Sequence, residues 1–380
     1  MKVVIAIDSF KGSLTSIEAG TAAAEGFKRA DKRIECKVKP LADGGEGTVE
    51  ALVAGMGGNL VSLQVTGPLG EKIESRYGII EEKKLAVIEM SAAAGITLVP
   101  KEKLNPMKTT TYGVGEIIKD AIGKGCRSFI IGIGGSSTND GGAGMLQALG
   151  FDLKDKEGKN ISYGAEGLSS LAEISDKNVL KEIKECSFKV ACDVNNPLCG
   201  EKGCSRVFAP QKGADLKMIE KMDAYLKKYA EIAKESFEEA DPDYPGAGAA
   251  GGLGFAFKSF LGAELTLGID LVIKETNLEE EIREADLVIT GEGKLDAQTS
   301  MGKAPVGVAK IAKKYGKRVI AFAGAVTEDA RECNEKGIDA FFPIVRGITT
   351  IEEALEKETA RRNLEETAEQ VARLIIASRT

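Results

Sequence analysis

The sequence has 380 residues, of which 43% are hydrophobic and 29% are charged, so it resembles an ordinary globular protein that is long for one hydrophobic core. Its net charge of −7 argues against nucleic acid as the main partner, because phosphate backbones attract basic surfaces. The sequence contains no histidine, which excludes a Ser-His-Asp triad, a Cys-His pair and a histidine-ligated zinc site. Proton transfer at neutral pH must therefore use a carboxylate, lysine, cysteine or tyrosine.

The start of the chain and its cysteines indicate the compartment. The apolar run Lys2–Ile7 is too short for the apolar region of a signal peptide, and no apolar run approaches the roughly 20 residues that span a membrane. Seven cysteines, an odd number, make a disulfide framework unfavourable, and their spacing lacks a Cys-x-x-Cys pair. We expect a cytoplasmic protein without a membrane partner.

Both ends of the chain alternate between strand and helix patterns. Lys2–Ile7 is typical of a buried strand, and Thr15–Glu18 forms a capping box that predicts a helix toward Ala30. A strand at Ile34–Lys39 and a helix through about Ala54 follow. The alternation returns near the C-terminus, where we predict strands at Leu287–Thr290, Val319–Ala323 and Ala340–Pro343, helices at about 305–315 and 328–336, and a final helix from the capping box Thr350–Glu353 toward Ile376. This rhythm predicts a doubly wound parallel sheet that joins both ends of the chain.

The middle of the chain has a mixed character. Its predicted strands are Val61–Val65, Lys72–Ile80, Leu85–Met90, Phe129–Ile133 and Phe188–Cys192, with helices at Met145–Leu149 and about 216–237. We therefore predict an α/β protein whose discontinuous doubly wound domain comprises residues 1–65 and 275–380. An inserted mixed α/β domain would comprise residues 66–274.

The stretch Gly132–Met145 carries the strongest functional signal. It follows a predicted strand and leads into a helix, which is an anion-binding arrangement, because glycine lets a ligand approach backbone N–H groups at a helix start. Its hydroxyls, amide and Asp140 would allow it to hold phosphate and metal together.

Polar residues follow other predicted strands as well, at Asp8–Ser13, Asp43–Gly47, Asp193–Pro197 and Gly291–Thr299. Ligands of parallel sheets bind at these strand ends, although Asp, Asn and Gly also favour turns for backbone reasons alone. The combination of glycine, lysine and carboxylates predicts a site for a nucleotide with Mg²⁺.

Two familiar nucleotide motifs are excluded. The sequence has no Gly-x-x-x-x-Gly-Lys-[Ser/Thr] motif, so an ordinary P-loop is absent. Gly246–Gly251 matches Gly-x-Gly-x-x-Gly but follows Asp241–Pro245 instead of a strand, so we interpret it as dense packing of small residues.

These segments together resemble the bacterial ATP-dependent glycerate kinase family of the two-domain, glycerate 2-kinase class (class I). The resemblance runs along nearly the whole chain, in the stretches Asp8–Ser13, Pro40–Thr48, Gly132–Met145, Ala191–Leu198, Phe208–Ala214, Gly246–Gly254, Asp286–Asp296 and Gln298–Thr299. It implies flavodoxin-like and restriction-enzyme-like domains. It also implies transfer of the γ-phosphoryl group of ATP, with Mg²⁺, to D-glycerate, giving 2-phosphoglycerate and ADP.

Individual roles follow from the chemistry of phosphoryl transfer, which needs alignment, charge neutralisation and an acceptor for the hydroxyl proton. We predict Asp193 as this acceptor, Asp296 as the second choice, and Lys11 as a further catalytic residue. The predicted nucleotide-binding residues are Gly44, Gly45, Gly134, Gly135, Ser136, Ser137, Asn139, Lys294 and Lys303; those for glycerate are Asn195, Arg206 and Lys212; and those for Mg²⁺ are Asp43, Asp140 and Glu292. We expect these groups to line a cleft between the two domains.

The residues alone leave other functions open. Another ATP- or phosphosugar-using α/β enzyme would use the same loops, and so would a non-catalytic nucleotide sensor. An oligomer is also compatible with the sequence.

Overall fold

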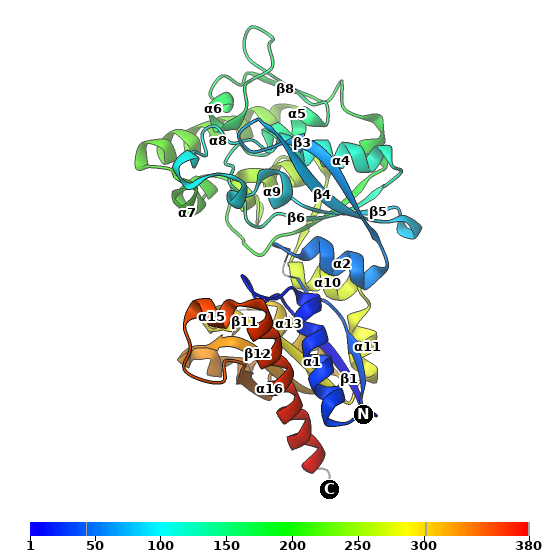
Figure 1. The fold of residues 1–380 in the computed structure, drawn as a ribbon. Coiled ribbons are helices and arrows are strands. Elements are labelled where there is room, and N and C mark those ends of the chain that lie inside the picture. Colours follow the sequence, from blue (N-terminus) through cyan, green and yellow to red (C-terminus); the bar gives the residue numbers. More distant parts are fainter. Residues whose placement is uncertain (43, 301, 379–380) are drawn as a thin grey trace. The chain divides into compact units, whose positions relative to one another are not determined.

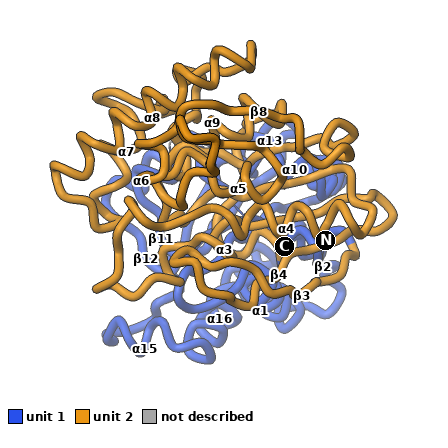
Figure 2. The backbone as a smooth tube through the Cα atoms, turned by 90° about the horizontal axis from the view of Figure 1, so that it is seen from above, with its two compact units in different colours: residues 1–43, 50–56, 269–380 blue, residues 44–49, 57–268 orange. Residues whose placement is uncertain are grey.

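The computed structural model of the protein describes residues 1–42, 44–300 and 302–378, and the chain forms two compact units (Figures 1 and 2). Unit 1 comprises Met1–Asp43, Glu50–Met56 and Ile269–Thr380. Unit 2 comprises Gly44–Val49 and Gly57–Gly268. Unit 1 has a parallel sheet and unit 2 a mostly parallel one, both accompanied by helices, so the α/β class predicted from the sequence is confirmed.

Unit 1 is built on a five-stranded sheet in the order β13-β12-β11-β1-β2, in which every neighbouring pair is parallel. Its strands are β1 (Lys2–Ile7), β2 (Glu35–Val38), β11 (Leu287–Leu295), β12 (Arg318–Val326) and β13 (Ala340–Pro343). Along the chain these strands occupy the flavodoxin-like order 2-1-3-4-5, which reverses between β1 and β11. The doubly wound sheet built from both ends of the chain is therefore present.

Helices cover both faces of this sheet, because alternate residues of β1 are buried on each side. Val3, Ile5 and Ile7 pack in one core with α1 (Ser16–Ala30) and α16 (Lys357–Ala377). Val4 and Ala6 are fully buried too. The remaining helices with residues in unit 1 are α2 (Thr48–Met56), α10 (Gly268–Glu275), α11 (Leu278–Glu284), α12 (Ala297–Ser300), α13 (Ala304–Lys314), α14 (Glu332–Glu335) and α15 (Ile351–Leu355).

Some element boundaries in unit 1 differ from those predicted from the sequence. The strand predicted to end at Thr290 continues to Leu295, because Lys294 and Leu295 pair with the equally extended end of β12. The single helix predicted after Thr350 is broken at Glu356, whose carboxylate caps α16 by accepting hydrogen bonds from the N–H groups of Glu358 and Thr359. Both predicted capping boxes, at Thr15 and Thr350, are confirmed.

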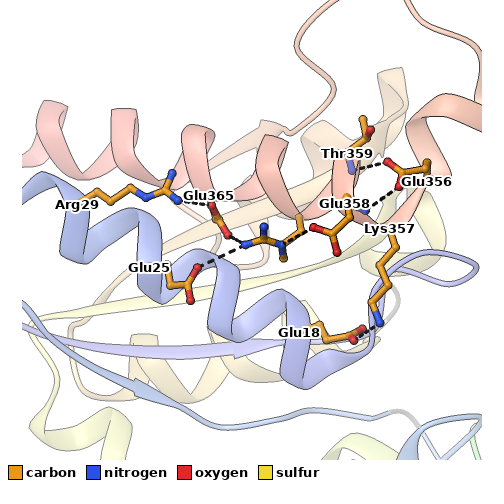
Figure 3. Close-up of polar contacts among 9 residues, drawn as sticks. Glu18, Glu25, Arg29, Glu356, Lys357, Glu358, Thr359 and Glu365 are labelled. Atoms are coloured by element: carbon orange, nitrogen blue, oxygen red, sulfur yellow. Dashed lines mark hydrogen bonds and ion pairs between the residues drawn. The ribbon is translucent and has the colours of Figure 1, made fainter.

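A buried carboxylate joins α1 to α16 (Figure 3). Glu365 is 2% exposed and accepts hydrogen bonds from Arg29, at 2.6 Å, and from Arg361. Burial raises the pKa of Glu365, and the neighbouring Glu25 acts in the same direction against the two arginines. The helices touch through backbone atoms at Gly26, where a Cβ would lie 2.2 Å from the carbonyl oxygen of Glu365.

Unit 2 is built on a six-stranded sheet in the order β10-β9-β6-β5-β4-β3. The first four of these strands are parallel, while β4 pairs antiparallel with both β5 and β3. The strands are β3 (Asn59–Thr66), β4 (Lys72–Ile80), β5 (Leu85–Glu89), β6 (Ser128–Gly132), β9 (Ser187–Ala191) and β10 (Glu264–Thr266), and a separate hairpin comprises β7 (Asp152–Lys154) and β8 (Glu173–Ser175). The mixed sheet predicted for the middle of the chain is therefore present.

The main core of unit 2 extends from Val65 of β3 to Ala263 near β10, and a smaller cluster comprises Ala165, Ala209, Ile219 and Met222. Its helices are α3 (Ser91–Ala94), α4 (Tyr112–Gly123), α5 (Ala143–Ala148), α6 (Gly164–Leu168), α7 (Cys204–Phe208), α8 (Leu216–Ser236) and α9 (Ala249–Leu261). Among the described residues, no helix is both long enough and apolar enough to cross a membrane.

The compact units differ from the predicted domain ranges at two places. Residues 59–65 were assigned to the doubly wound domain, but they form β3, which pairs along its whole length with β4 in unit 2. The short segment Gly44–Val49 also belongs to unit 2. At the second junction the unit boundary follows Gly268, six residues before the predicted one.

Candidate functional site

The parallel strands of unit 2 end together at one edge of the sheet. Glu89 of β5 is in register with Gly132 of β6, Gly132 is in register with Ala191 of β9, and Ala191 is in register with Thr266 of β10. Ligands of parallel sheets bind beyond such an edge. The glycine-rich stretch that begins at Gly132 therefore starts where a ligand site is expected.

A second glycine loop lies directly on this edge. A Cβ on Gly132 would lie 2.4 Å from the carbonyl oxygen of Gly44, and a Cβ on Gly134 would lie 3.1 Å from the Cα of Gly45. Gly44 itself has a φ of +87°, and a Cβ there would lie 2.4 Å from the Cβ of Ala191. The structure thus brings together the two glycine loops predicted to bind nucleotide, and only glycine permits this backbone-to-backbone approach.

Hydrogen bonds to the interior of unit 2 fix the loop after β6. Ser137 is 1% exposed, and both its N–H and its hydroxyl donate to the carbonyl oxygen of Ala94, each at 2.9 Å. Asn139 is fully buried, and its side-chain amide donates to the hydroxyl of Ser205 at 2.8 Å. Both side chains therefore point into the protein, whereas Gly135 is exposed with a φ of +72°.

Asp140 holds the start of α5. Its Oδ2 accepts hydrogen bonds from the N–H of Thr111 at 2.9 Å, from the hydroxyl of Thr111 at 2.8 Å and from the N–H of Gly144 at 3.3 Å, while Oδ1 accepts from Gly142. Complete burial raises the pKa of Asp140, and these hydrogen bonds oppose the rise. With both oxygens occupied by protein donors, Asp140 is poorly suited to the predicted Mg²⁺ role.

Lys212 reaches the same loop from another part of the sequence. It is 1% exposed, and its Nζ donates hydrogen bonds to Ser136 Oγ at 2.7 Å and to the carbonyl oxygen of Thr138 at 2.6 Å. Burial lowers the pKa of Lys212 to about 8, against the opposing effects of Cys204 and Asp140. The structure thus joins two predicted site residues, Lys212 and Ser136, in one hydrogen bond.

The other predicted residues of unit 2 lie toward solvent. Asp193 lies two residues after the end of β9, is exposed, and accepts a hydrogen bond from the N–H of Gly268 at 3.0 Å. Asn195 is exposed two residues further on. Arg206 of α7 is exposed as well, and its guanidinium lies 3.7 Å from the carboxylate of Glu201. Side chains in such positions are accessible to a ligand.

In unit 1, the predicted residues gather near the point where the strand order reverses. β1 and β11 stay in register from Val3–Leu287 to Ile7–Gly291, after which β11 continues beside β12 alone. Beyond β1, a Cβ on Gly293 would lie 3.3 Å from the backbone nitrogen of Lys11. The reversal point of a flavodoxin-like sheet is its usual ligand site.

A hydrogen-bonded group of side chains stands at the end of β11. Glu292 is 9% exposed and accepts a hydrogen bond from the hydroxyl of Thr299 at 2.5 Å. Asp296 accepts from the N–H of Gln298 and lies 3.2 Å from the Lys294 ammonium. Partial burial raises the pKa of Asp296, but Lys294 and the backbone donors outweigh it, so this pKa lies below its usual value.

The remaining predictions concern a cation and a metal. Lys303 is the residue before α13, and its Nζ donates to the side-chain oxygen of Gln298 at 3.1 Å. Asp43 lies outside the described residues. Within the described residues, no group of three acidic or cysteine side chains is arranged to hold a metal ion.

Sequence reasoning missed several residues that build the site. Thr111 anchors Asp140, Thr109 donates to the carbonyl oxygen of Ser137 at 2.9 Å, and Glu89 accepts from the N–H of Val49 at 2.8 Å. The sequence signal that could have indicated these residues is the run of three threonines at 109–111, directly before a helix. The interpretation of Gly246–Gly251 as dense packing is supported, since a Cβ on Gly251 would lie 2.1 Å from the carbonyl oxygen of Thr138.

Comparison with known proteins decides the family. The model of the glycerate kinase family matches residues 3–376 of the chain. The protein belongs to the glycerate kinase family. The resemblance seen in the sequence is thus confirmed, and the family membership marks the protein as a kinase rather than a nucleotide sensor.

Relatives match over nearly the full length. The chain is 49% identical to a glycerate 2-kinase of Escherichia coli K12 over 93% of both chains, and 47% identical to a glycerate kinase of Haemophilus influenzae over 99% of both. A crystal structure of a Salmonella typhimurium LT2 protein assigned to glycerate kinase 2 is similar with a TM-score of 0.92, at 46% identity, over 100% of this chain and 99% of the other. The fold of this family is therefore the fold of this protein.

Proposed function

We propose that the protein transfers the γ-phosphoryl group of Mg-ATP to the 2-hydroxyl of D-glycerate, giving 2-phosphoglycerate and ADP. The full-length relative named as a glycerate 2-kinase supports this activity. The observation that carries it in the structure is the sheet edge of unit 2, where two glycine loops meet above the ends of β6 and β9. Because Gly44 and Gly132 carry no side chains, the two loops approach each other closely there, and glycine-rich loops of this kind commonly present backbone N–H groups to an anionic ligand. We place this reaction in the cytoplasm.

Asp193 is the proposed acceptor of the hydroxyl proton. As the 2-hydroxyl oxygen bonds to the γ-phosphorus, its proton passes to the Asp193 carboxylate, and the bond from that phosphorus to the bridging oxygen of ADP breaks. Asp193 is exposed at the end of β9, and the N–H of Gly268 fixes its orientation. Asp296 is the weaker candidate, because its lowered pKa and its ion pair with Lys294 make it a poorer base.

We propose that the basic residues of unit 1 neutralise the charge of the nucleotide phosphates. Lys11 follows β1, Lys294 lies near the end of β11, and Lys303 precedes α13. Phosphoryl transfer depends on such charge neutralisation more than on covalent chemistry. Asn195 and Arg206, exposed in unit 2, are proposed to bind glycerate.

Mg²⁺ is proposed to enter as part of the Mg-ATP substrate. Mg²⁺ usually keeps several waters and binds one or two carboxylates together with substrate phosphates. Glu292 remains a proposed ligand, whereas we now assign Asp140 to holding α5.

A product assay tests the proposed function. The protein is incubated with Mg-ATP and D-glycerate, the product is identified by phosphorus NMR, and ADP is measured in parallel. We expect 2-phosphoglycerate and ADP in equal amounts, with no ADP when D-glycerate is omitted. Formation of 3-phosphoglycerate would overturn the proposed position of transfer, and absence of both products would overturn the activity.

A further inference from the structure

We propose that Lys212 is a positioning residue that acts through Ser136: its ammonium group fixes the Ser136 hydroxyl, which then donates a hydrogen bond to an anionic oxygen of a bound substrate. This inference rests on the proposed kinase function. It replaces the direct contact between Lys212 and glycerate that the sequence suggested.

The ammonium group of Lys212 is too deeply placed to touch a substrate itself. The residue is 1% exposed, and two of its three protons are donated, to Ser136 and to the carbonyl oxygen of Thr138. The short turn Pro210–Lys212 that carries it closes at Gly213, with a φ of +92°, where a Cβ would lie 2.5 Å from the carbonyl oxygen of Leu104. Lys212 is therefore fixed in the interior.

Ser136 stands between this interior and the exposed loop. It is 9% exposed and follows Gly135, which is exposed. Its Oγ accepts a hydrogen bond from the ammonium group of Lys212, so the proton of the Ser136 hydroxyl must point elsewhere, and the structure records no acceptor for it within residues 1–42, 44–300 and 302–378. A hydroxyl whose proton lacks a protein acceptor is suited to donate to a ligand.

The backbone on both sides of Ser136 is held, so the hydroxyl has a defined place. Ser136 pairs with Gly95 in a single β-bridge, and the N–H of Ile96 donates to the carbonyl oxygen of Gly135 at 2.8 Å. Ser137 is tied to Ala94 on the other side. A substrate would meet this hydroxyl already oriented, which lowers the entropy lost on binding.

The charge of Lys212 strengthens this donor. Cys204 of α7 and Asp140 are the titratable groups whose charges act on Lys212. Burial raises the pKa of Cys204 to about 12, so its thiol is neutral at pH 7, and Asp140 is hydrogen-bonded to Thr111. An ammonium group that donates to a hydroxyl oxygen polarises that hydroxyl. The hydroxyl proton then becomes a better hydrogen-bond donor.

The ligand atom is an anionic oxygen, supplied either by the glycerate carboxylate or by a nucleotide phosphate. Binding calorimetry with D-glycerate alone and with Mg-ADP alone separates these sources. Ser136→Ala is expected to weaken one of the two by about tenfold, as for a hydrogen bond to a charged group. Lys212→Met should lower the affinity for the same ligand. The double variant should bind that ligand no more weakly than the weaker-binding single variant does.

The pH dependence distinguishes positioning from a merely structural role. In the unmodified protein, affinity for that ligand should fall as pH rises through about 8, where Lys212 loses its proton. This fall should be absent in Ser136→Ala, even if Lys212→Met is unstable. The matched controls are Ser259→Ala, which removes a buried hydroxyl that has no hydrogen-bond partner among the described residues, and Lys228→Met on α8. Both variants should bind the ligand as the unmodified protein does.

The outcomes separate the two proposals. If the unmodified protein makes no product from Mg-ATP and D-glycerate, the kinase function fails. If it makes product and Ser136→Ala binds both ligands within twofold of normal, the role of Ser136 fails while the kinase function stands. Additive losses in the double variant would show that Lys212 contacts the ligand independently, and would overturn the positioning role.

Discussion

Asp140 and Thr111 are joined twice, since the same carboxylate oxygen accepts both the N–H and the hydroxyl of Thr111, at 2.9 and 2.8 Å. The hydroxyl of Thr111 in turn accepts from the N–H of Met145, at 3.0 Å. This chain of bonds ties the start of α4 to the start of α5. An acid that the sequence suggested as a metal ligand thus has a structural role.

We therefore predict that Asp140→Asn lowers the free energy of unfolding by about 3 kcal/mol, because the amide nitrogen would face N–H donors in a buried site. Urea denaturation measures the change. The control, Asp155→Asn, alters an acid that caps a turn by accepting from the N–H groups of Glu157 and Lys159. It should cost about 1 kcal/mol or less. Unchanged stability combined with a raised Mg²⁺ requirement would instead support a metal role for Asp140.

Stability should also depend on pH through Lys212, whose pKa is about 8 in the folded protein against 10.5 as its ordinary value. Between these values the unfolded chain binds more protons, so the free energy of unfolding rises with pH across this window. The free-energy cost of burying the charged Lys212 is complete below pH 8 and is gone above pH 10.5. Across this pH window we expect the free energy of unfolding to rise by up to about 3 kcal/mol more than it does in Lys212→Met. Urea denaturation from pH 7 to 10.5 measures this change. An equal dependence of the free energy of unfolding on pH in the unmodified protein and in Lys212→Met would contradict the prediction.

Replacing the proposed base should separate catalysis from binding. Asn at position 193 keeps an oxygen that can accept from the Gly268 N–H but cannot take the hydroxyl proton. We predict a fall in kcat of about 10²- to 10⁴-fold with little change in KM. Steady-state kinetics measure both variants, and Asp296→Asn should show a smaller fall in kcat than Asp193→Asn. Near-normal turnover by a folded Asp193→Asn variant would remove Asp193 from this role.

Two helix glycines provide a matched test of packing. Gly26→Ala would place a Cβ 2.2 Å from the carbonyl oxygen of Glu365, so α1 and α16 must separate, at a cost of about 1 to 3 kcal/mol. Gly123→Ala, in α4, meets no atom within 4 Å and should gain about 0.5 to 1 kcal/mol. Thermal unfolding of both variants gives the comparison. Equal shifts would show that the close contact at Gly26 does not control stability.

Much of unit 1 was predictable, because its local signals are strong. The apolar run Lys2–Ile7 and the capping boxes at Thr15 and Thr350 act within a few residues. The extension of β11 was not predictable in this way, since Gly291–Leu295 has turn composition. It becomes strand only beside β12, which lies more than 20 residues away in the sequence.

The candidate site shows the same limit. Ser136 and Lys212 were both predicted from composition and context, but their contact spans 76 positions and no sequence period reports it. The inward direction of Ser137 and Asn139 depends on acceptors and donors at Ala94 and Ser205. Tertiary packing, which a single sequence does not reveal, decides whether a polar loop residue faces a ligand or the core.

The strand order of unit 1 has a consequence for how the chain is made. The N–H of Lys2 donates to Asp286, 284 positions later, so β1 emerges from the ribosome long before its neighbour β11 exists. Unit 2, nearly continuous from Gly57 to Gly268, is complete before then. During that interval β1 and β2 carry an unpaired strand edge, which is a template for association with other chains. Interrupted synthesis before Leu287 would thus release a finished unit 2 attached to two strands that have no sheet to join.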